Sequence, residues 1–158
     1  MSSPHKNIYQ EQFADFGLNK NLLRNISFVF IKFNIKGFNM INLLSVFIGG
    51  GIGSVLRWLC CQLITNHWGT FVVNVLGAFF IGVAYTYFEK YTNLPPATKT
   101  FIMTGLLGGF TTFSTYLLNF TTLFNQNSHL EAFLYLIGSV VVGAVFLILG
   151  MKALSFIQ

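Results

Sequence analysis

The chain has 158 residues, of which 54% are hydrophobic, and it carries nine basic and four acidic side chains. Its charged fraction of 8% is far below the roughly one quarter found in soluble domains, so the composition argues against a soluble enzyme and indicates a small integral membrane protein. Five of the nine basic residues lie in residues 1–39, and no basic stripe with interleaved aromatic side chains follows, so the positive charge does not indicate nucleic-acid binding.

Residues 1–39 form a basic N-terminal extension that is too polar to cross a membrane. Its apolar stretch, residues 26–38, is interrupted by Lys32, Asn34 and Lys36, and it lacks the pattern of a cleavable signal peptide. Three interpretations are open: the extension lies on the membrane surface, it is disordered, or it is a start-site artefact and the natural start is Met40. We place the domain boundary here and expect a transmembrane domain in residues 40–158.

Four hydrophobic stretches follow, at residues 41–65, 70–88, 100–124 and 131–154. At about 1.5 Å per helical residue, each is long enough to cross a hydrocarbon core of roughly 30 Å. Their connectors are short, and the one at 89–99 contains Pro95 and Pro96. The prediction is an all-α, multi-pass protein of the cell (inner) membrane with four transmembrane helices.

The orientation of these helices is weakly specified. Four spans place both termini and the connector 89–99 on one side, which holds Lys90, Lys99 and Lys152, whereas Arg57 lies near the other side. Without the extension, the positive-inside rule therefore gives little bias. A weak bias allows insertion in both orientations and hence an antiparallel dimer.

The first stretch contains a glycine cluster followed by a basic residue near the end of the span. Gly49 and Gly53 have the four-residue spacing of helix dimer motifs. Arg57 either extends toward the headgroups or draws anions into a vestibule. The adjacent Cys60 and Cys61 have no partner at disulfide or metal-ligand spacing in the sequence and are expected to be small apolar helix residues.

Polar residues recur at helical spacing in the second and fourth stretches. Thr70 and Asn74 share one helix face, and Tyr135 and Ser139 share another. These pairs either bond neighbouring helices or line a narrow path rich in N–H and O–H donors, which suits a small anion. The acidic residues Glu89 and Glu131 lie at helix ends, an arrangement that argues against a proton-coupled exporter.

The third stretch carries the strongest signal, a run from Gly108 to Thr115 in which two glycines precede four hydroxyl-bearing residues. Each glycine costs a helix about 1 kcal/mol relative to alanine, and the run is centred near the bilayer midpoint. We predict a break in this helix. Freed carbonyls there must face protein or a cavity and can bind a hard cation such as Na⁺. The alternative is a continuous helix with a glycine-rich packing face.

From Met40 onward the chain resembles the Fluc (CrcB-type) fluoride channels. The shared motifs are Gly49-Gly50-x-x-Gly53-x-x-x-Arg57, Gly69-Thr70-x-x-x-Asn74-x-x-Gly77 and Gly108-Gly109-Phe110-Thr111-Thr112-Phe113-Ser114-Thr115. The resemblance implies a non-enzymatic channel that exports cytoplasmic fluoride passively and lowers fluoride toxicity. It also implies a dual-topology, antiparallel homodimer in membrane lipid, with fluoride as the transported ion.

The resemblance further implies a structural sodium ion that is not transported, bound by the backbone carbonyls of Gly108 and Thr111 of both subunits. It places Arg57 in the vestibule and the following residues along the fluoride pore: Thr70, Asn74, Phe113, Ser114, Tyr116, Tyr135 and Ser139.

Two residues depart from the family pattern: Tyr116 replaces a second phenylalanine, and Asn119 replaces a frequent acid. These departures leave open a subunit that works only beside a paralogous partner. A small dual-topology multidrug-type exporter is the further alternative.

Overall fold

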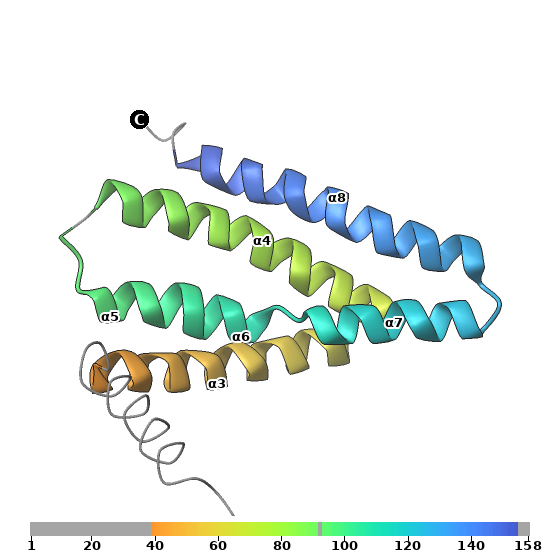
Figure 1. The fold of residues 1–158 in the computed structure, drawn as a ribbon, viewed down its shortest axis with the longest axis horizontal. Helices are drawn as coiled ribbons and strands as arrows, with labels where there is room; N and C mark the ends of the chain where they lie inside the picture. The colour runs from red at the N-terminus through yellow and green to blue at the C-terminus, as the bar shows by residue number, and fades with distance from the viewer. Residues whose placement is uncertain (1–38, 92, 155–158) are drawn as a thin grey trace, which may run out of the picture. The chain divides into compact units, whose positions relative to one another are not determined.

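A computed structural model describes residues 39–91 and 93–154, and these residues contain four helical segments long and apolar enough to cross a membrane. They are α3 (Met40–Leu63), α4 (His67–Lys90), a composite third span (Pro96–Asn125) and α8 (His129–Ala153). Figure 1 shows their order. The prediction of an all-α protein with four spans is confirmed, whereas almost all of the predicted N-terminal extension lies outside the described residues.

The third span is assembled from four pieces. These are α5 (Pro96–Lys99), the π-helix η1 (Thr100–Leu107), α6 (Gly108–Phe110) and α7 (Phe113–Asn125). The span begins four residues earlier than predicted, because Pro96 occupies the first helical position, where a proline ring fits and no N–H is needed.

Two asparagines make the short reversals at one end of the helices. Asn66, between α3 and α4, has φ 65°, and Asn127, between α7 and α8, has φ 61°. Asparagine tolerates this left-handed conformation better than other residues with a Cβ.

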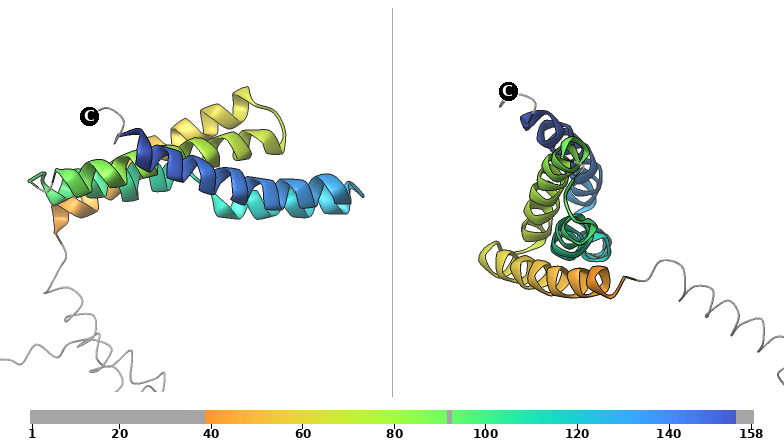
Figure 2. Two further views of the ribbon diagram at one scale, coloured as in Figure 1. Left: turned by 90° about the horizontal axis from the view of Figure 1, so that it is seen from above. Right: turned by 90° about the vertical axis from the view of Figure 1, so that its left-hand side faces the viewer.

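The helices approach one another closely at glycines. In Figures 1 and 2, α8 lies beside α4 and α3 lies beside the first half of the third span. A Cβ on Gly150 would collide with the Phe79 carbonyl oxygen. On α3, a Cβ on Gly49 would lie 2.6 Å from the Phe101 carbonyl oxygen. The Gly49/Gly53 spacing, which resembles a dimer motif, therefore serves packing within the subunit.

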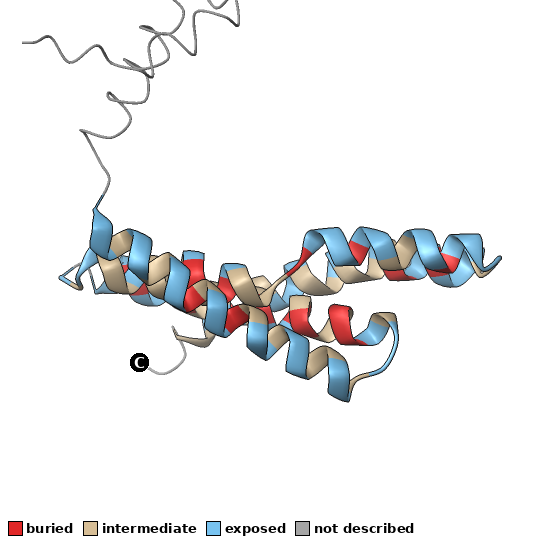
Figure 3. Ribbon diagram, turned by 90° about the horizontal axis from the view of Figure 1, so that it is seen from below, coloured by how far each residue is buried: buried red, intermediate tan, exposed pale blue. Residues whose placement is uncertain are grey.

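Most large apolar side chains face outward. Figure 3 shows that buried residues form only short patches on the helices. Phe47 on α3 is 78% exposed and Leu130 on α8 is 76% exposed, as expected for surfaces that contact lipid or another subunit. Cys60 and Cys61 are free, half-buried thiols.

Candidate functional site

The third span is interrupted at Thr111 and Thr112. Thr111 has φ −84° and ψ 159°, and Thr112 has φ −151° and ψ 118°, so both are extended between the end of α6 and the start of α7. Figure 1 shows this as a non-helical connection. The break predicted from Gly108, Gly109 and the hydroxyl run is confirmed.

Asn74 of α4 holds the break through two hydrogen bonds. Its Oδ1 accepts from the Thr112 backbone N–H at 2.8 Å, and its Nδ2 donates to the Thr112 carbonyl at 3.0 Å. In a continuous helix the Thr112 N–H would donate to the Gly108 carbonyl. The amide of Asn74 therefore satisfies the extended backbone and releases the Gly108 carbonyl from its helical partner.

The hydroxyl of Thr112 restarts the helix after the break. Its Oγ1 accepts from the Thr115 backbone N–H at 3.3 Å, which is the geometry of a threonine N-cap. In an uninterrupted helix this N–H would donate to the Thr111 carbonyl. The Thr111 carbonyl is thus released as well.

Arg57 contacts the break from α3, whereas Asn74 contacts it from α4. Its Nη1 donates to the Thr111 carbonyl at 3.1 Å, and its side chain is half-buried. A charged donor on a carbonyl makes a stronger hydrogen bond than a neutral one. The sequence predicts Arg57 either at the headgroups or in a vestibule, whereas its contact with Thr111 joins two different helices and has no signal in the sequence of either one.

Two further glycines let the neighbouring helices reach the break. A Cβ on Gly77 of α4 would collide with the Thr111 methyl group, and a Cβ on Gly109 would lie 2.6 Å from the Gly50 carbonyl oxygen. A hollow of about 270 Å³ lies beside the break, and its lining includes Asn74, Thr112 and Phe113.

The carbonyls of Gly108 and Thr111 are suitable ligands for a hard cation. Within residues 39–91 and 93–154 the structure has no cluster of three or more His, Cys, Asp or Glu side chains that could hold a metal. A cation at the break would therefore be bound by backbone oxygens, which suit Na⁺. The break removes the helical partners of these two carbonyls, and the Thr111 carbonyl also accepts from Arg57 Nη1.

Two tyrosines form a second cluster between α7 and α8. Tyr116 is 5% exposed and Tyr135 is 4% exposed, and their ring centroids are 5.4 Å apart. The Tyr116 hydroxyl donates to the Leu136 carbonyl at 2.5 Å. The additional hydroxyl at position 116 is thereby bound to the backbone of α8.

Tyr135 has two neighbours that the sequence analysis did not assign to the site. Asn119 Nδ2 donates to the Tyr135 hydroxyl oxygen at 3.3 Å, and the His67 ring packs edge-on against the tyrosine ring with a centroid distance of 5.0 Å. His67 Nε2 lies 3.5 Å from Glu131 Oε1. The sequence signal that could have pointed to His67 is its position as the first residue of an apolar span.

The structure brings the predicted pore residues into two adjoining groups, which meet where the ring centroids of Phe113 and Tyr116 are 5.7 Å apart. Asn74 and Phe113 line the hollow at the break, and Tyr116 and Tyr135 pack together. Thr70 is buried on α4, and Ser114 is exposed near Phe113. Among the described residues, the buried Ser139 hydroxyl has no hydrogen-bond partner. Their contacts with an ion remain predictions.

Comparison with known proteins points to one family throughout. The family model described as CrcB-like protein, Camphor Resistance (CrcB), matches residues 44–151. A fluoride-specific ion channel FluC of Hydrogenobaculum sp. (strain Y04AAS1) is 40% identical over 114 residues, which cover 69% of this chain and 93% of that protein. The FluC channel of Phocaeicola vulgatus is 43% identical over 117 residues, covering 70% and 96%. The FluC channel of Aquifex aeolicus is 38% identical over 112 residues, covering 67% and 90%.

Proposed function

This chain belongs to the CrcB-like family, and from that premise we propose that it is a fluoride-specific ion channel that lets cytoplasmic fluoride leave passively and so lowers its toxicity. The observation that carries the proposal is the break in a membrane span, held by Asn74 and lined by hydroxyl groups. Irregular backbone at membrane depth is tolerated where it is buried in protein or lines a cavity.

The chemistry of the site suits fluoride. Fluoride is small and strongly hydrated, so a selective path must replace its water with closely spaced donors. The Ser139 hydroxyl is buried with no partner among the described residues and is free to donate. The ring of Phe113, beside the hollow at the break, can present its positive edge to an anion. A narrow path would then exclude the larger chloride ion.

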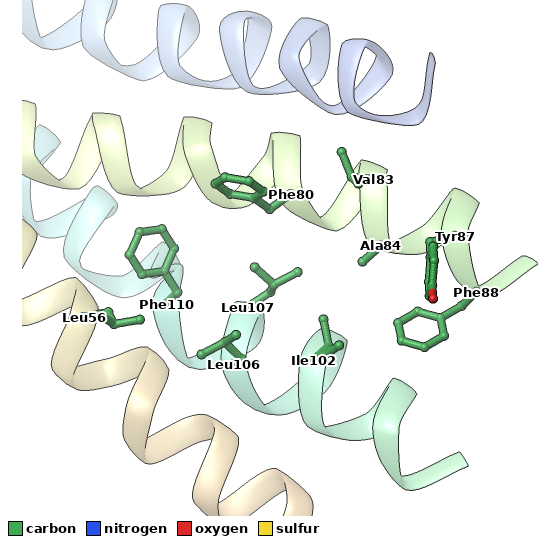
Figure 4. Close-up of a pocket in the computed structure, with 10 residues that line it drawn as sticks. All are labelled: Leu56, Phe80, Val83, Ala84, Tyr87, Phe88, Ile102, Leu106, Leu107 and Phe110. Carbon is green, nitrogen blue, oxygen red and sulfur yellow. The ribbon is translucent and has the colours of Figure 1, made fainter. Parts of the chain in front are cut away.

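A second copy of the chain, inserted in the opposite orientation, would complete the path. Phe113 is 70% exposed on the single subunit, although the proposal requires its ring to face an ion rather than lipid. An apolar groove of about 410 Å³ lies nearby, lined from three spans by residues that include Leu56, Phe80 and Phe110 (Figure 4). A second copy seated here would take these side chains, and the Phe113 ring, out of contact with lipid.

A sodium ion between the two subunits would take the carbonyls of Gly108 and Thr111 from each chain. It would be structural and would not cross the membrane. A fixed positive charge offsets part of the cost of bringing an anion into a medium of low dielectric. The break removes the helical partner of the Gly108 carbonyl, and the Thr111 carbonyl can still offer its second lone pair beside the bond from Arg57, which supports this assignment.

Two alternatives place the same fold in another role. A paralogous partner could cover the exposed face in place of a second copy. A multidrug-type exporter would normally need an acidic group within the membrane, whereas Glu89 and Glu131 are exposed at the ends of their helices. The fluoride channel explains the broken span, the hydroxyl groups and the Phe113 ring, which the exporter does not.

The test is fluoride efflux from liposomes that contain the purified chain alone, followed with a fluoride electrode beside a chloride control. We expect rapid release of fluoride without release of chloride and without an added proton gradient or ATP. Well-folded dimers that release no fluoride would favour the obligate heterodimer. Equal release of fluoride and chloride would contradict selectivity. Protein-free liposomes correct for leak.

A further inference from the structure

The two buried tyrosines use their hydroxyl groups differently. The Tyr116 hydroxyl donates a hydrogen bond to the Leu136 carbonyl of α8, so it has no proton left for another acceptor. The Tyr135 oxygen instead accepts a hydrogen bond from Asn119 Nδ2 at 3.3 Å. Across residues 39–91 and 93–154 the structure gives the Tyr135 proton no acceptor.

A hydroxyl group has one proton to donate, and its oxygen can accept as well. Because Asn119 already donates to the Tyr135 oxygen, the Tyr135 proton must point to another partner. Tyr135 is only 4% exposed, and a buried donor without an acceptor is costly. Tyr135 also lines a hollow of about 350 Å³ between α4 and α8, which gives a ligand room beside it. An anion in reach of the hydroxyl can accept this proton and has none to donate in return.

We propose that Asn119 is a positioning residue that orients the Tyr135 hydroxyl as a donor to the permeating fluoride ion. The proposal rests on the proposed channel function. An acidic side chain at position 119 would accept the Tyr135 proton and compete with the ion, whereas the amide directs that proton away from itself. Its hydrogen bond also polarises the tyrosine O–H and makes it a better donor.

The ring of Tyr135 is held by other residues. His67 packs edge-on against it, and Tyr116 packs against it with a centroid distance of 5.4 Å. The ring should therefore stay in place when Asn119 is changed, so that the substitution alters the hydroxyl direction rather than the position of the side chain.

The test compares Asn119→Leu with the wild type in liposome flux measured over a range of fluoride concentrations. Leucine is similar in size but cannot donate. We expect the half-saturating fluoride concentration to rise about fivefold, the value of one hydrogen bond of about 1 kcal/mol, with the maximal flux little changed. The control Thr122→Val removes a hydroxyl on the same helix that bonds only to the Leu118 carbonyl, and it should match the wild type.

A double-mutant cycle distinguishes positioning from a general structural role. In a Tyr135→Phe background, Asn119→Leu should change the half-saturating concentration no further, because no hydroxyl remains to orient. The same fivefold rise in both backgrounds, or no rise in either, would overturn the proposal. If Asn119→Leu does not fold, Asn119→Ala tests the same contact. A wild-type chain that releases no fluoride would instead refute the channel function itself.

Discussion

Asn74 and Thr112 exchange two hydrogen bonds between α4 and the third span, one at 2.8 Å and one at 3.0 Å. The residues are 38 positions apart in the sequence, and the pair connects a side-chain amide with the N–H and carbonyl of one extended residue. The amide therefore takes the place of the helical bonds that the break removes.

Replacing Asn74 with leucine should destabilise the break. Both backbone groups of Thr112 would lose their partners, and we expect the free energy of unfolding to fall by about 3 kcal/mol, with loss of fluoride flux. Thermal unfolding in detergent measures the first effect and liposome efflux the second. Asn42→Leu is the matched control, because Asn42 Oδ1 is buried without a hydrogen-bond partner among the described residues. Equal melting temperatures for the two variants would contradict the assigned role of Asn74.

Arg57 combines a hydrogen bond to the Thr111 carbonyl with a positive charge, and Arg57→Gln removes both. Glutamine is shorter and loses the contact together with the charge, so the free energy of unfolding should fall by about 2 kcal/mol, whereas only the effect of the charge on flux should depend on salt. If the charge also gathers anions in a vestibule, fluoride flux should fall about threefold at low ionic strength, and the difference should vanish in high salt. Flux that is equal at every salt concentration would limit Arg57 to its contact with the break.

Tyr116→Phe supplies the phenylalanine that the resemblance to the Fluc channels leads us to expect at this position. The lost hydroxyl bonds to the Leu136 carbonyl, so the free energy of unfolding should fall by about 1 kcal/mol while fluoride flux stays close to the wild-type value. Thermal unfolding and efflux check the two effects. Complete loss of flux would mean that the tyrosine hydroxyl itself contacts the ion.

Phe113→Ile should abolish fluoride flux, because isoleucine has no positively polarised ring edge to replace water around the ion. Efflux from liposomes is the measurement. Phe47→Ile controls for a general effect of losing an exposed phenylalanine. The Phe47 side chain is 78% exposed, close to the 70% of Phe113, and it lies on α3 outside the break. Unchanged flux in Phe113→Ile would refute the proposed pore.

Removal of sodium tests the carbonyls of Gly108 and Thr111. If a sodium ion bridges two subunits, purification with choline in place of Na⁺ should weaken the dimer, and added Na⁺ should restore it. Size-exclusion chromatography and chemical crosslinking report the oligomeric state. A dimer that is indifferent to Na⁺ would contradict the site, even if the chain still conducts fluoride.

The sequence was sufficient to predict the four spans and the break. Hydropathy and length determine the spans, and Gly108 and Gly109 before a hydroxyl run mark a weak helix. These are local properties, and the structure confirms them within a few residues of the predicted bounds.

The contacts that hold the break could not be predicted in this way. The bonds from Arg57 to Thr111 and from Asn74 to Thr112 join different helices, and no spacing within one helix reveals which residues of another face it. For the same reason, the Gly49/Gly53 spacing suggested contact between subunits although it serves packing within one. The bond from Asn119 to Tyr135 likewise joins two helices, α7 and α8, so the sequence alone marks Asn119 only as a departure from the family pattern.

The interruption of the third span also creates two helix ends at membrane depth. The helix that ends at Phe110 has the partial negative charge of its dipole there, and α7, which starts at Phe113, has a partial positive charge of about half an elementary charge at its first turn. A cation beside Gly108 and an anion beside Phe113 are each favoured by the nearer helix end. The backbone therefore provides fields of both signs at a depth where charged side chains are most costly, and an unbroken helix would provide neither.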